Sequence, residues 1–286
     1  MTSFAPTLTD AALQDELDQR GYVVVPLLDA DEVAELRDFY RSAVAAGEIN
    51  PEGAYDPTYA EFSVVHSHPE FRALAFERIV EVVGPRTAEL LEPHRPLVAN
   101  YVNKPPGTGI VPMHQNWYVV DEAHHRSVSV WIALVDCSAD NGTLQFLPGS
   151  HRALREPRGM WAYEAFADVA DLIEPSLEVV EISAGQAIVL DDAVVHYSPP
   201  NRTAADRLAI QLIMVPDQVP ALFCERVGEH DDRYEVDVWA VEPPFFWNFW
   251  HGVGDPQHGS VVRHIEVSSH RFDAEDVSTR LAVGPR

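Results

Sequence analysis

Residues 186–215 have the sequence QAIVLDDAVVHYSPPNRTAADRLAIQLIMV. The apolar runs Gln186 to Leu190 and Arg207 to Val215 have the length and the β-branched content of strands. Between them, Ser198-Pro199-Pro200-Asn201 predicts a turn, because proline lacks the backbone N–H that a sheet requires. A further apolar segment, Ala193 to Tyr197, contains His196 and also predicts a strand. The stretch therefore predicts a sheet protein with a histidine on one of its strands.

Short strands of the same kind are predicted upstream, at Leu97 to Asn103, Val128 to Asp136, Thr143 to Leu147 and Leu177 to Ile182. Clusters of turn-forming residues such as Asp140-Asn141-Gly142 separate them. Several short strands punctuated in this way are typical of a sandwich or jelly roll. A jelly roll is open at one end, where it can hold a metal between its sheets.

The N-terminal residues show a different pattern. Helices are predicted at Ala11 to Arg20 and after Asp29, which has capping-box spacing to Glu32. Tyr22 to Leu28 predicts a strand between them, and a later helix is expected to stop near Gly84-Pro85. With no internal repeat or linker, we predict one domain over residues 1–286. It has a helical N-terminal layer (about 1–95), a jelly-roll core (about 96–216) and a C-terminal extension (about 217–286) that packs on or covers the barrel.

The composition limits the possible partners. The chain has 286 residues, 46% of them hydrophobic, which is enough to bury a large core, and a net charge of -25. A surface this acidic repels phosphate backbones and anionic lipid, so nucleic acid and membranes are not expected as partners. We expect a small-molecule substrate, and the sequence does not indicate an oligomeric state.

The composition also bears on location. No apolar run approaches the roughly 18 residues that span a bilayer, and residues 1–10 do not resemble a signal peptide. Cys137 and Cys224 lie in unrelated segments and suggest neither a disulfide framework nor a zinc site. These features predict a cytoplasmic protein.

A candidate metal site involves His114, Asn116 and His196. Residues i and i+2 of a strand point to the same face, so His114 and Asn116 are expected to reach one metal ion, with His196 approaching from another strand. Two imidazoles and a carboxylate form the facial set of non-haem Fe(II) oxygenases. Here the position expected to carry the carboxylate has the neutral amide of Asn116.

Arg207 and Ser198 are candidate anion-binding residues. Arg207 begins a strand eleven residues after His196, and its guanidinium offers a planar fork of donors that matches a carboxylate. Ser198 lies two residues after His196 and would share its face. Arg207 at a strand start could also be an ordinary surface residue.

Seven segments occur together, in the order Gly21-Tyr22-Val23-Val24, Asn103-Lys104-Pro105-Pro106, His114-Gln115-Asn116, Val130-Trp131, Asn141-Gly142-Thr143-Leu144, Pro148-Gly149-Ser150-His151, and His196 through Asn201 to Arg207. This ordered set resembles the phytanoyl-CoA dioxygenase family of iron and 2-oxoglutarate dependent oxygenases. The resemblance covers roughly residues 10 to 216 and depends on the whole set, because any single segment would be weak evidence.

The resemblance implies a mainly β fold, the double-stranded β-helix or cupin-like jelly roll, behind an N-terminal helical layer. It implies that His114, Asn116 and His196 are the catalytic ligands of Fe(II), and that the cosubstrate 2-oxoglutarate is bound by Arg207, Ser198 and Trp131. O2 is the other cosubstrate. Members of this family hydroxylate, desaturate, epoxidise or halogenate small molecules. We therefore expect hydroxylation of a small organic molecule, such as a natural-product intermediate, with release of succinate and CO2.

Asn116 departs from the family pattern, which has aspartate at this position. An amide oxygen is a neutral, weaker donor, so the change predicts weaker iron binding and predicts that Asn116→Asp would strengthen it. The interpretations that remain open are an active oxygenase that tolerates the amide, a non-catalytic member that binds a metabolite or partner, a halogenase, and an engineered variant. A cupin-like metalloenzyme that does not use 2-oxoglutarate is a further alternative.

Other aromatic and histidine residues are less informative. The cluster Phe245 to His251 is expected to pack the C-terminal segment against the barrel, with a lid over the barrel mouth as the alternative. His124, His125 and His151 fall in or beside turns, where we expect exposed histidines without a role in the site.

Overall fold

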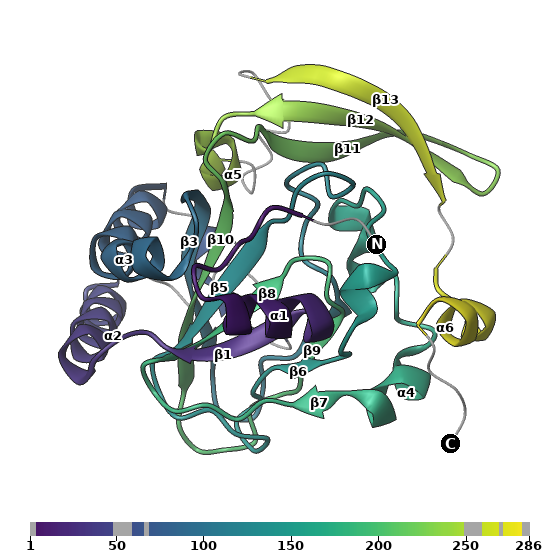
Figure 1. Ribbon diagram of the computed structural model, residues 1–286. Helices are drawn as coiled ribbons and strands as arrows, with labels where there is room; N and C mark the ends of the chain where they lie inside the picture. Colours follow the sequence, from purple (N-terminus) through teal and green to yellow (C-terminus); the bar gives the residue numbers. More distant parts are fainter. Residues whose placement is uncertain (1–3, 48–58, 66–68, 249–258, 269–270, 282–286) are drawn as a thin grey trace.

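The computed structural model describes residues 4–47, 59–65, 69–248, 259–268 and 271–281 (Figure 1). Its strands are β1 (Tyr22–Pro26), β2 (Glu61–Phe62), β3 (His94–Lys104), β4 (Val111–His114), β5 (Val128–Ala133), β6 (Gln145–Phe146), β7 (Glu178–Val179), β8 (Gln186–Asp191), β9 (His196–Ser198), β10 (Arg207–Pro216), β11 (Ala221–His230), β12 (Arg233–Val241) and β13 (Ser260–Ser268). Its α-helices are α1 (Ala11–Arg20), α2 (Ala30–Ala45), α3 (Pro69–Leu90), α4 (Ala170–Ile173), α5 (Pro244–Asn248) and α6 (Ala274–Arg280). Short 3-10 helices cover Ser63–Val65, Ser150–Arg152, Met160–Glu164 and Glu174–Ser176.

Two antiparallel sheets form the core of the fold. The larger has the strand order β1-β8-β5-β10-β3-β2 and the smaller the order β4-β9-β6-β7. From β3 to β10 the chain passes repeatedly from one sheet to the other, as a jelly roll requires. Side chains of both sheets meet between them, for example where Tyr22 stacks on Phe146 with ring centroids 4.2 Å apart. The predicted mainly β, jelly-roll fold is confirmed.

The larger sheet is covered by the helices on one face and by the smaller sheet on the other. Alternate residues along its strands face these two sides. On β5, Val128, Val130 and Ile132 pack in one cluster with the helices, whereas Trp131 faces the smaller sheet. β10 behaves in the same way, because Leu208, Ile210 and Leu212 join the helical cluster and Arg207 faces inward. Strands buried on both faces are expected to be almost continuously apolar, so the few inward polar residues stand out.

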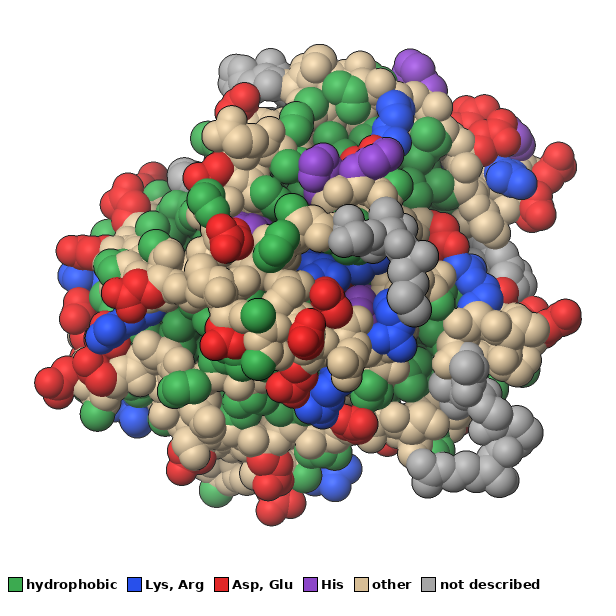
Figure 2. Space-filling model, viewed as in Figure 1, with side chains coloured by type: hydrophobic (Ala, Val, Ile, Leu, Met, Phe, Trp, Pro, Cys, Tyr) green, Lys and Arg blue, Asp and Glu red, His purple; other side chains and the backbone are tan. Residues whose placement is uncertain are grey.

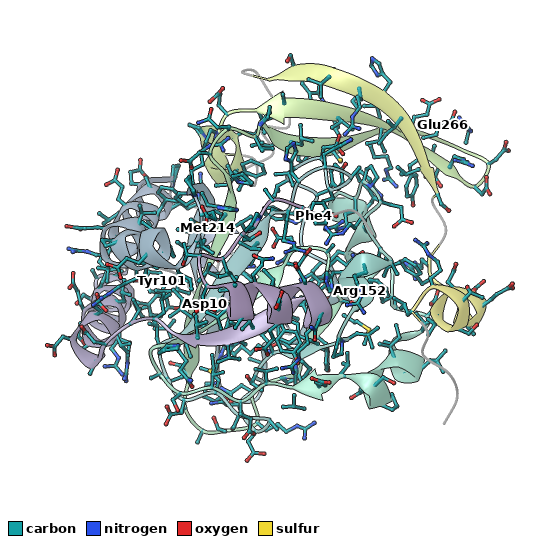
Figure 3. The ribbon with its side chains drawn as sticks, viewed as in Figure 1. Phe4, Asp10, Tyr101, Arg152, Met214 and Glu266 are labelled. Atoms are coloured by element: carbon teal, nitrogen blue, oxygen red, sulfur yellow. The ribbon has the colours of Figure 1, made fainter. Side chains whose placement is uncertain are left out.

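Helices α1 to α3 supply the N-terminal layer (Figure 1). The capping box predicted from Asp29 and Glu32 is present at the start of α2. Tyr101 of β3 joins this layer to the sheet, since its hydroxyl donates to the Leu36 carbonyl over 3.0 Å and its ring packs on Tyr40 (Figure 3). The layer is not purely helical, because β1 is an edge strand of the larger sheet.

The C-terminal residues form a third sheet, β11-β12-β13, which lies across one end of the molecule (Figure 1). It packs on the jelly roll, because Val219, Ala221 and Phe246 share a buried cluster with Leu97 and Ile213. In the predicted aromatic cluster Phe245 and Phe246 pack in this way, whereas Phe249, Trp250 and His251 lie outside the described residues. That residues 1–286 form one domain stays a prediction.

The predicted end of the third helix was wrong. α3 continues through Pro85 to Leu90. Proline in a helix interior removes one backbone hydrogen bond and strains the preceding turn. The helix tolerates this loss because Ile79, Val83 and Thr87, on both sides of the proline, are buried along one face.

Among the predicted strands, those of the larger sheet lie where expected, whereas Thr143 to Leu147 and Leu177 to Ile182 shorten to β6 and β7, of two residues each. None of the helices in the described ranges is long and apolar enough to cross a membrane. Acidic side chains outnumber basic ones on the face drawn in Figure 2, as the net charge of -25 implies.

His151 is buried, and the expectation that it is exposed was wrong. Its side chain packs against the Gly21 turn, and a ring nitrogen lies 3.2 Å from the Asp18 carbonyl oxygen. Burial lowers the pKa of His151 to about 4. His124 and His125 are exposed, as expected.

We expect His151 to make the folded protein sensitive to acid. Between pH 6.5 and about 4 the unfolded chain protonates this ring and the folded chain does not, so stability falls as the pH falls, by up to about 1.4 kcal/mol per pH unit. Urea denaturation at several pH values should show a shallower pH slope for His151→Gln than for the wild type. The exposed His124→Gln is the control, and equal slopes for wild type and His151→Gln would contradict the assignment.

Candidate functional site

His114 and His196 face each other across a strand pair. His114 is the last residue of β4 and His196 the first of β9, and they are direct partners in the antiparallel ladder of the smaller sheet. Their ring centroids are 4.2 Å apart. Both side chains are buried and line the same cavity. The structure thus brings together the two histidines that the sequence singled out.

The hydrogen bonds of the two rings fix their tautomers. Nδ1 of His114 lies 2.7 Å from the Pro112 carbonyl oxygen, and Nδ1 of His196 lies 3.0 Å from the Val194 carbonyl oxygen. A carbonyl oxygen only accepts, so each Nδ1 carries the proton and each Nε2 keeps its lone pair. Burial lowers the pKa of His114 to about 4 and that of His196 well below its usual range. Both imidazoles are therefore neutral near pH 7, the state that binds a metal ion.

Asn116 reaches the same cavity by a route that strand alternation did not predict. β4 ends at His114, so Asn116 lies beyond the strand, and its backbone N–H donates to the Asp192 carbonyl over 2.9 Å. Its side chain is buried and contacts His114. This contact raises the pKa of His114 and so partly offsets the lowering that burial causes. Asn116 is therefore beside the histidine pair, although the predicted reason was wrong.

The cavity between the sheets has a volume of about 420 Å³. Its wall is mostly apolar and aromatic, with contributions from Phe62, Val98, Trp117, Tyr163 and Ile213. The polar groups are few, which is typical of sites for small organic molecules.

Arg207 enters the cavity from the opposite sheet. It lies at the start of β10, in the larger sheet, whereas His114 and His196 are on strands of the smaller sheet. The side chain is 1% exposed, and its Nε and Nη1 have no hydrogen-bond partner within the described part of the chain. Its guanidinium carbon lies 5.0 Å from the ring centroid of Trp131, which supports it by a cation–π contact. Burial lowers the pKa of Arg207 to about 10, so the group stays charged at neutral pH.

Ser198 lines the cavity, but its hydroxyl already has partners. It donates to the Gly142 carbonyl over 2.8 Å and lies 2.5 Å from Nζ of Lys104. Lys104 also donates to the carbonyl oxygens of Ser198 and Pro199. The role of Ser198 in binding a carboxylate stays a prediction.

Lys104 is a residue whose place in the site was missed. It is fully buried opposite Arg207 in the β3–β10 pairing, and burial, followed by the charge of Arg207, lowers its pKa to about 5. The signal in the sequence was that it is the only lysine of the chain, within the segment Asn103-Lys104-Pro105-Pro106.

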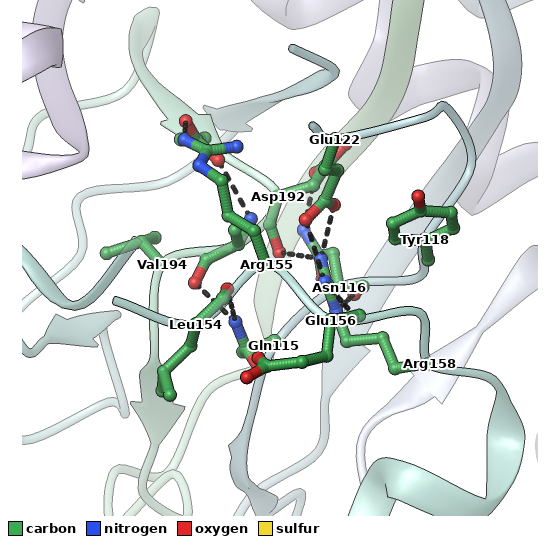
Figure 4. A network of polar contacts seen from close by, with 12 residues as sticks. Gln115, Asn116, Tyr118, Glu122, Leu154, Arg155, Glu156, Arg158, Asp192 and Val194 are labelled. Carbon is green, nitrogen blue, oxygen red and sulfur yellow. Dashed lines mark hydrogen bonds and ion pairs between the residues drawn. The ribbon is translucent and has the colours of Figure 1, made fainter. Parts of the chain in front are cut away.

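Arg158 and Glu122 form a buried ion pair next to Asn116 (Figure 4). Nη1 and Nη2 of Arg158 donate to the two carboxylate oxygens of Glu122 over 2.9 and 2.6 Å, and its Nε donates to the Asn116 carbonyl over 2.6 Å. The pair was not predicted, since its members are 36 residues apart and no local pattern links them.

These residues can be tested for their fit to iron and 2-oxoglutarate. In the ranges that the structure describes, no three histidine, cysteine, aspartate or glutamate side chains are placed to hold one metal ion. A third protein ligand for an ion beside His114 and His196 would therefore be of another kind, and the amide oxygen of Asn116 is chemically suitable. The unpaired donors of Arg207 fit a carboxylate. The site thus fits both groups, with an amide in place of one charge.

Comparison with known proteins identifies the family. The sequence profile of the phytanoyl-CoA dioxygenase (PhyH) family matches residues 17–209. Phytanoyl-CoA dioxygenase domain-containing protein 1 of Danio rerio is 31% identical over 120 residues, which are 39% of this chain and 41% of that protein. The chain spans about half the length, or less, of the curated relatives that it matches.

Two solved structures have the same fold. One is the non-heme alpha ketoglutarate dependent carbocyclase SnoK from nogalamycin biosynthesis, with a TM-score of 0.56 and 21% identity over 76% of this chain and 89% of that chain. The other is EctD from S. alaskensis with 2-oxoglutarate and 5-hydroxyectoine, with a TM-score of 0.53 and 21% identity over 74% of this chain and 78% of that chain. The fold is of the cupin-like class that Fe(II) and 2-oxoglutarate dependent oxygenases use. Within that class, the chain belongs to the phytanoyl-CoA dioxygenase (PhyH) family.

Proposed function

We propose that the protein is an Fe(II) and 2-oxoglutarate dependent oxygenase that hydroxylates a small organic molecule and releases succinate and CO2. The observation that carries the proposal is that two guanidinium nitrogens of Arg207, Nε and Nη1, have no hydrogen-bond partner among the described residues, in the cavity that also contains His114 and His196. A buried guanidinium without a counter-ion is costly, so its retention favours a ligand that supplies a carboxylate.

Each residue has a role in this proposal. His114, His196 and Asn116 would hold iron, which with 2-oxoglutarate and O2 supplies the oxidising chemistry. Arg207, supported by Trp131, would orient the cosubstrate through its distal carboxylate. Ser198 lines the same cavity as Arg207, and Lys104 contacts the Ser198 hydroxyl.

The substrate is expected to be largely apolar. The cavity wall excludes water around an organic molecule, and its volume of about 420 Å³ suits a small one. The net charge of -25 supports a small molecule as substrate rather than nucleic acid.

A second candidate is a family member that binds a metabolite without turnover, and the amide at Asn116 favours it. A halogenase is less well supported, because halogenating sites that resemble this family would carry a small residue such as glycine or alanine where this chain has the larger Asn116, which lines the cavity.

Turnover distinguishes these candidates. With Fe(II), 2-oxoglutarate and air, we expect slow succinate formation that rises when a panel of small apolar molecules contains a substrate. Samples without 2-oxoglutarate, and samples with a chelator, are the controls. Binding of 2-oxoglutarate without succinate under any condition would favour the non-catalytic candidate, and the absence of both iron and 2-oxoglutarate binding would overturn the proposal.

A further inference from the structure

The nitrogen of the Asn116 amide has two hydrogen-bond partners, Ser129 and Asp192, and Figure 4 shows the contact with Asp192. Nδ2 of Asn116 donates to Ser129 Oγ and to Asp192 Oδ1, both over 2.9 Å. Ser129 in turn donates to the same Asp192 oxygen over 2.7 Å. All three side chains are buried.

These contacts decide which way the amide points. A carboxylate oxygen accepts hydrogen bonds, and Ser129 uses its own proton on Asp192, so both groups require the nitrogen of the amide on their side. Both amide hydrogens are thus used, which leaves the oxygen for the contact that the side chain makes with His114. The side chain that replaces the expected carboxylate therefore presents an oxygen to His114.

The backbone strengthens this arrangement. Asn116 N donates to the Asp192 carbonyl, and Arg158 donates both to the Asn116 carbonyl, over 2.6 Å, and to the Asp192 carbonyl, over 3.1 Å. Residues 116 and 192 are consequently fixed relative to each other by contacts that do not depend on their side chains.

We propose that Asp192 is a positioning residue for the metal site, which with Ser129 turns the Asn116 oxygen toward the histidines and places a negative charge directly behind the amide. This inference rests on the proposed function. A carboxylate that accepts from an amide N–H polarises the amide and makes its oxygen a better donor. Asp192 acts through Asn116, since no acidic side chain of the described chain joins the two histidines in a metal-binding group of three.

The arrangement changes the expected effect of Asn116→Asp. From the sequence, this substitution should strengthen iron binding. In the structure it would replace a donor by a second carboxylate against Asp192, in a buried position where like charges repel. The negative charge that is missing at position 116 is carried by Asp192, which contacts the Asn116 amide nitrogen. The double exchange Asn116→Asp with Asp192→Asn would move this charge to the position where the family usually has it.

A double-mutant cycle tests the inference, with Co(II) affinity as the readout, measured by calorimetry without oxygen or 2-oxoglutarate. We expect Asp192→Asn to weaken binding about tenfold or more, the size typical for residues behind a metal ligand. Asn116→Asp alone should not bind Co(II) more tightly than the wild type. The double exchange should bind more tightly than either single variant, so that the two effects are not additive.

Matched controls separate positioning from folding. Asp121→Asn makes the same chemical change in a carboxylate that pairs with Tyr118 and Arg263 instead, and should leave Co(II) affinity unchanged. Ser129→Ala removes one of the two acceptors of the amide and should weaken binding even if Asp192→Asn does not fold. Near-ultraviolet circular dichroism checks the folding of each variant.

The outcomes distinguish this inference from the function on which it rests. If the wild type binds Co(II) no better than His196→Ala, the metal site and the proposed function fail together. If the wild type binds and Asp192→Asn and Ser129→Ala bind equally well, only the role of Asp192 is overturned. The role of Asp192 would also be overturned if Asn116→Asp alone bound Co(II) as tightly as the double exchange.

Discussion

We expect Arg207→Met to bind 2-oxoglutarate at least about a hundredfold more weakly than the wild type. Nε and Nη1 of Arg207 have no partner in the described part of the chain, and each would donate to the carboxylate. A hydrogen bond to a charged group contributes about 1.5–3 kcal/mol, so losing two costs about 3 kcal/mol or more, and 1.4 kcal/mol is tenfold in affinity. Titration calorimetry with 2-oxoglutarate measures the change directly.

The same substitution should not destabilise the ligand-free protein. Arg207 is 1% exposed, and burial lowers its pKa to about 10, which reflects the cost of keeping a charge in this position. Methionine has a similar length and removes that charge, so the free energy of unfolding should stay the same or increase. The wild type would then have exchanged stability for a binding site.

Thermal denaturation tests both parts of this expectation. Adding 2-oxoglutarate should raise the Tm of the wild type and leave that of Arg207→Met unchanged. Arg86→Met, which alters a surface arginine paired with Glu32, is the control and should respond like the wild type. If Arg207→Met still binds 2-oxoglutarate with wild-type affinity, the carboxylate is anchored elsewhere.

Much of the fold could be predicted from the sequence because it depends on local patterns. The strands of the larger sheet are long enough for their apolar character to be evident, and β10 was predicted to within one residue. β6 and β7 were overestimated because only two residues of each pair in the ladder, whereas the apolar pattern extends beyond the pairing. The end of α3 was misjudged because packing on both sides of Pro85 outweighs a local signal.

The candidate site was predictable only in part, for a related reason. His114, His196 and Arg207 carry chemistry in their side chains, and their place in the ordered set of segments that resembles the family selected them. The surroundings of Asn116 depend on Asp192, 76 residues away, and on Ser129 and Arg158. Contacts between residues so far apart in the sequence follow from the fold. Without knowledge of these contacts, an asparagine at position 116 is interpreted only as the loss of a carboxylate charge.

Arg158→Met should destabilise the protein strongly, by about 3–5 kcal/mol, because it leaves the Glu122 carboxylate buried without a partner. Glu122 is 1% exposed and receives two hydrogen bonds from this arginine. The substitution also removes the donors to the backbone of Asn116 and Asp192, so it should loosen the metal site as well. Urea denaturation at neutral pH measures the first effect.

The free energy of unfolding that Arg158→Met loses should depend on pH, in a direction that identifies the unpaired Glu122 carboxylate as the cause. Burial raises the pKa of Glu122 above its usual value of about 4.5, and without Arg158 it rises further. Above pH 4.5 the folded variant then holds a proton that the unfolded chain releases, so its stability falls as the pH rises through that raised pKa. We expect a smaller deficit at pH 5 than at pH 8. The double variant Glu122→Leu with Arg158→Met, which removes both charges, should recover most of the stability. An equal deficit at both pH values would show that the unpaired carboxylate is not what destabilises the variant.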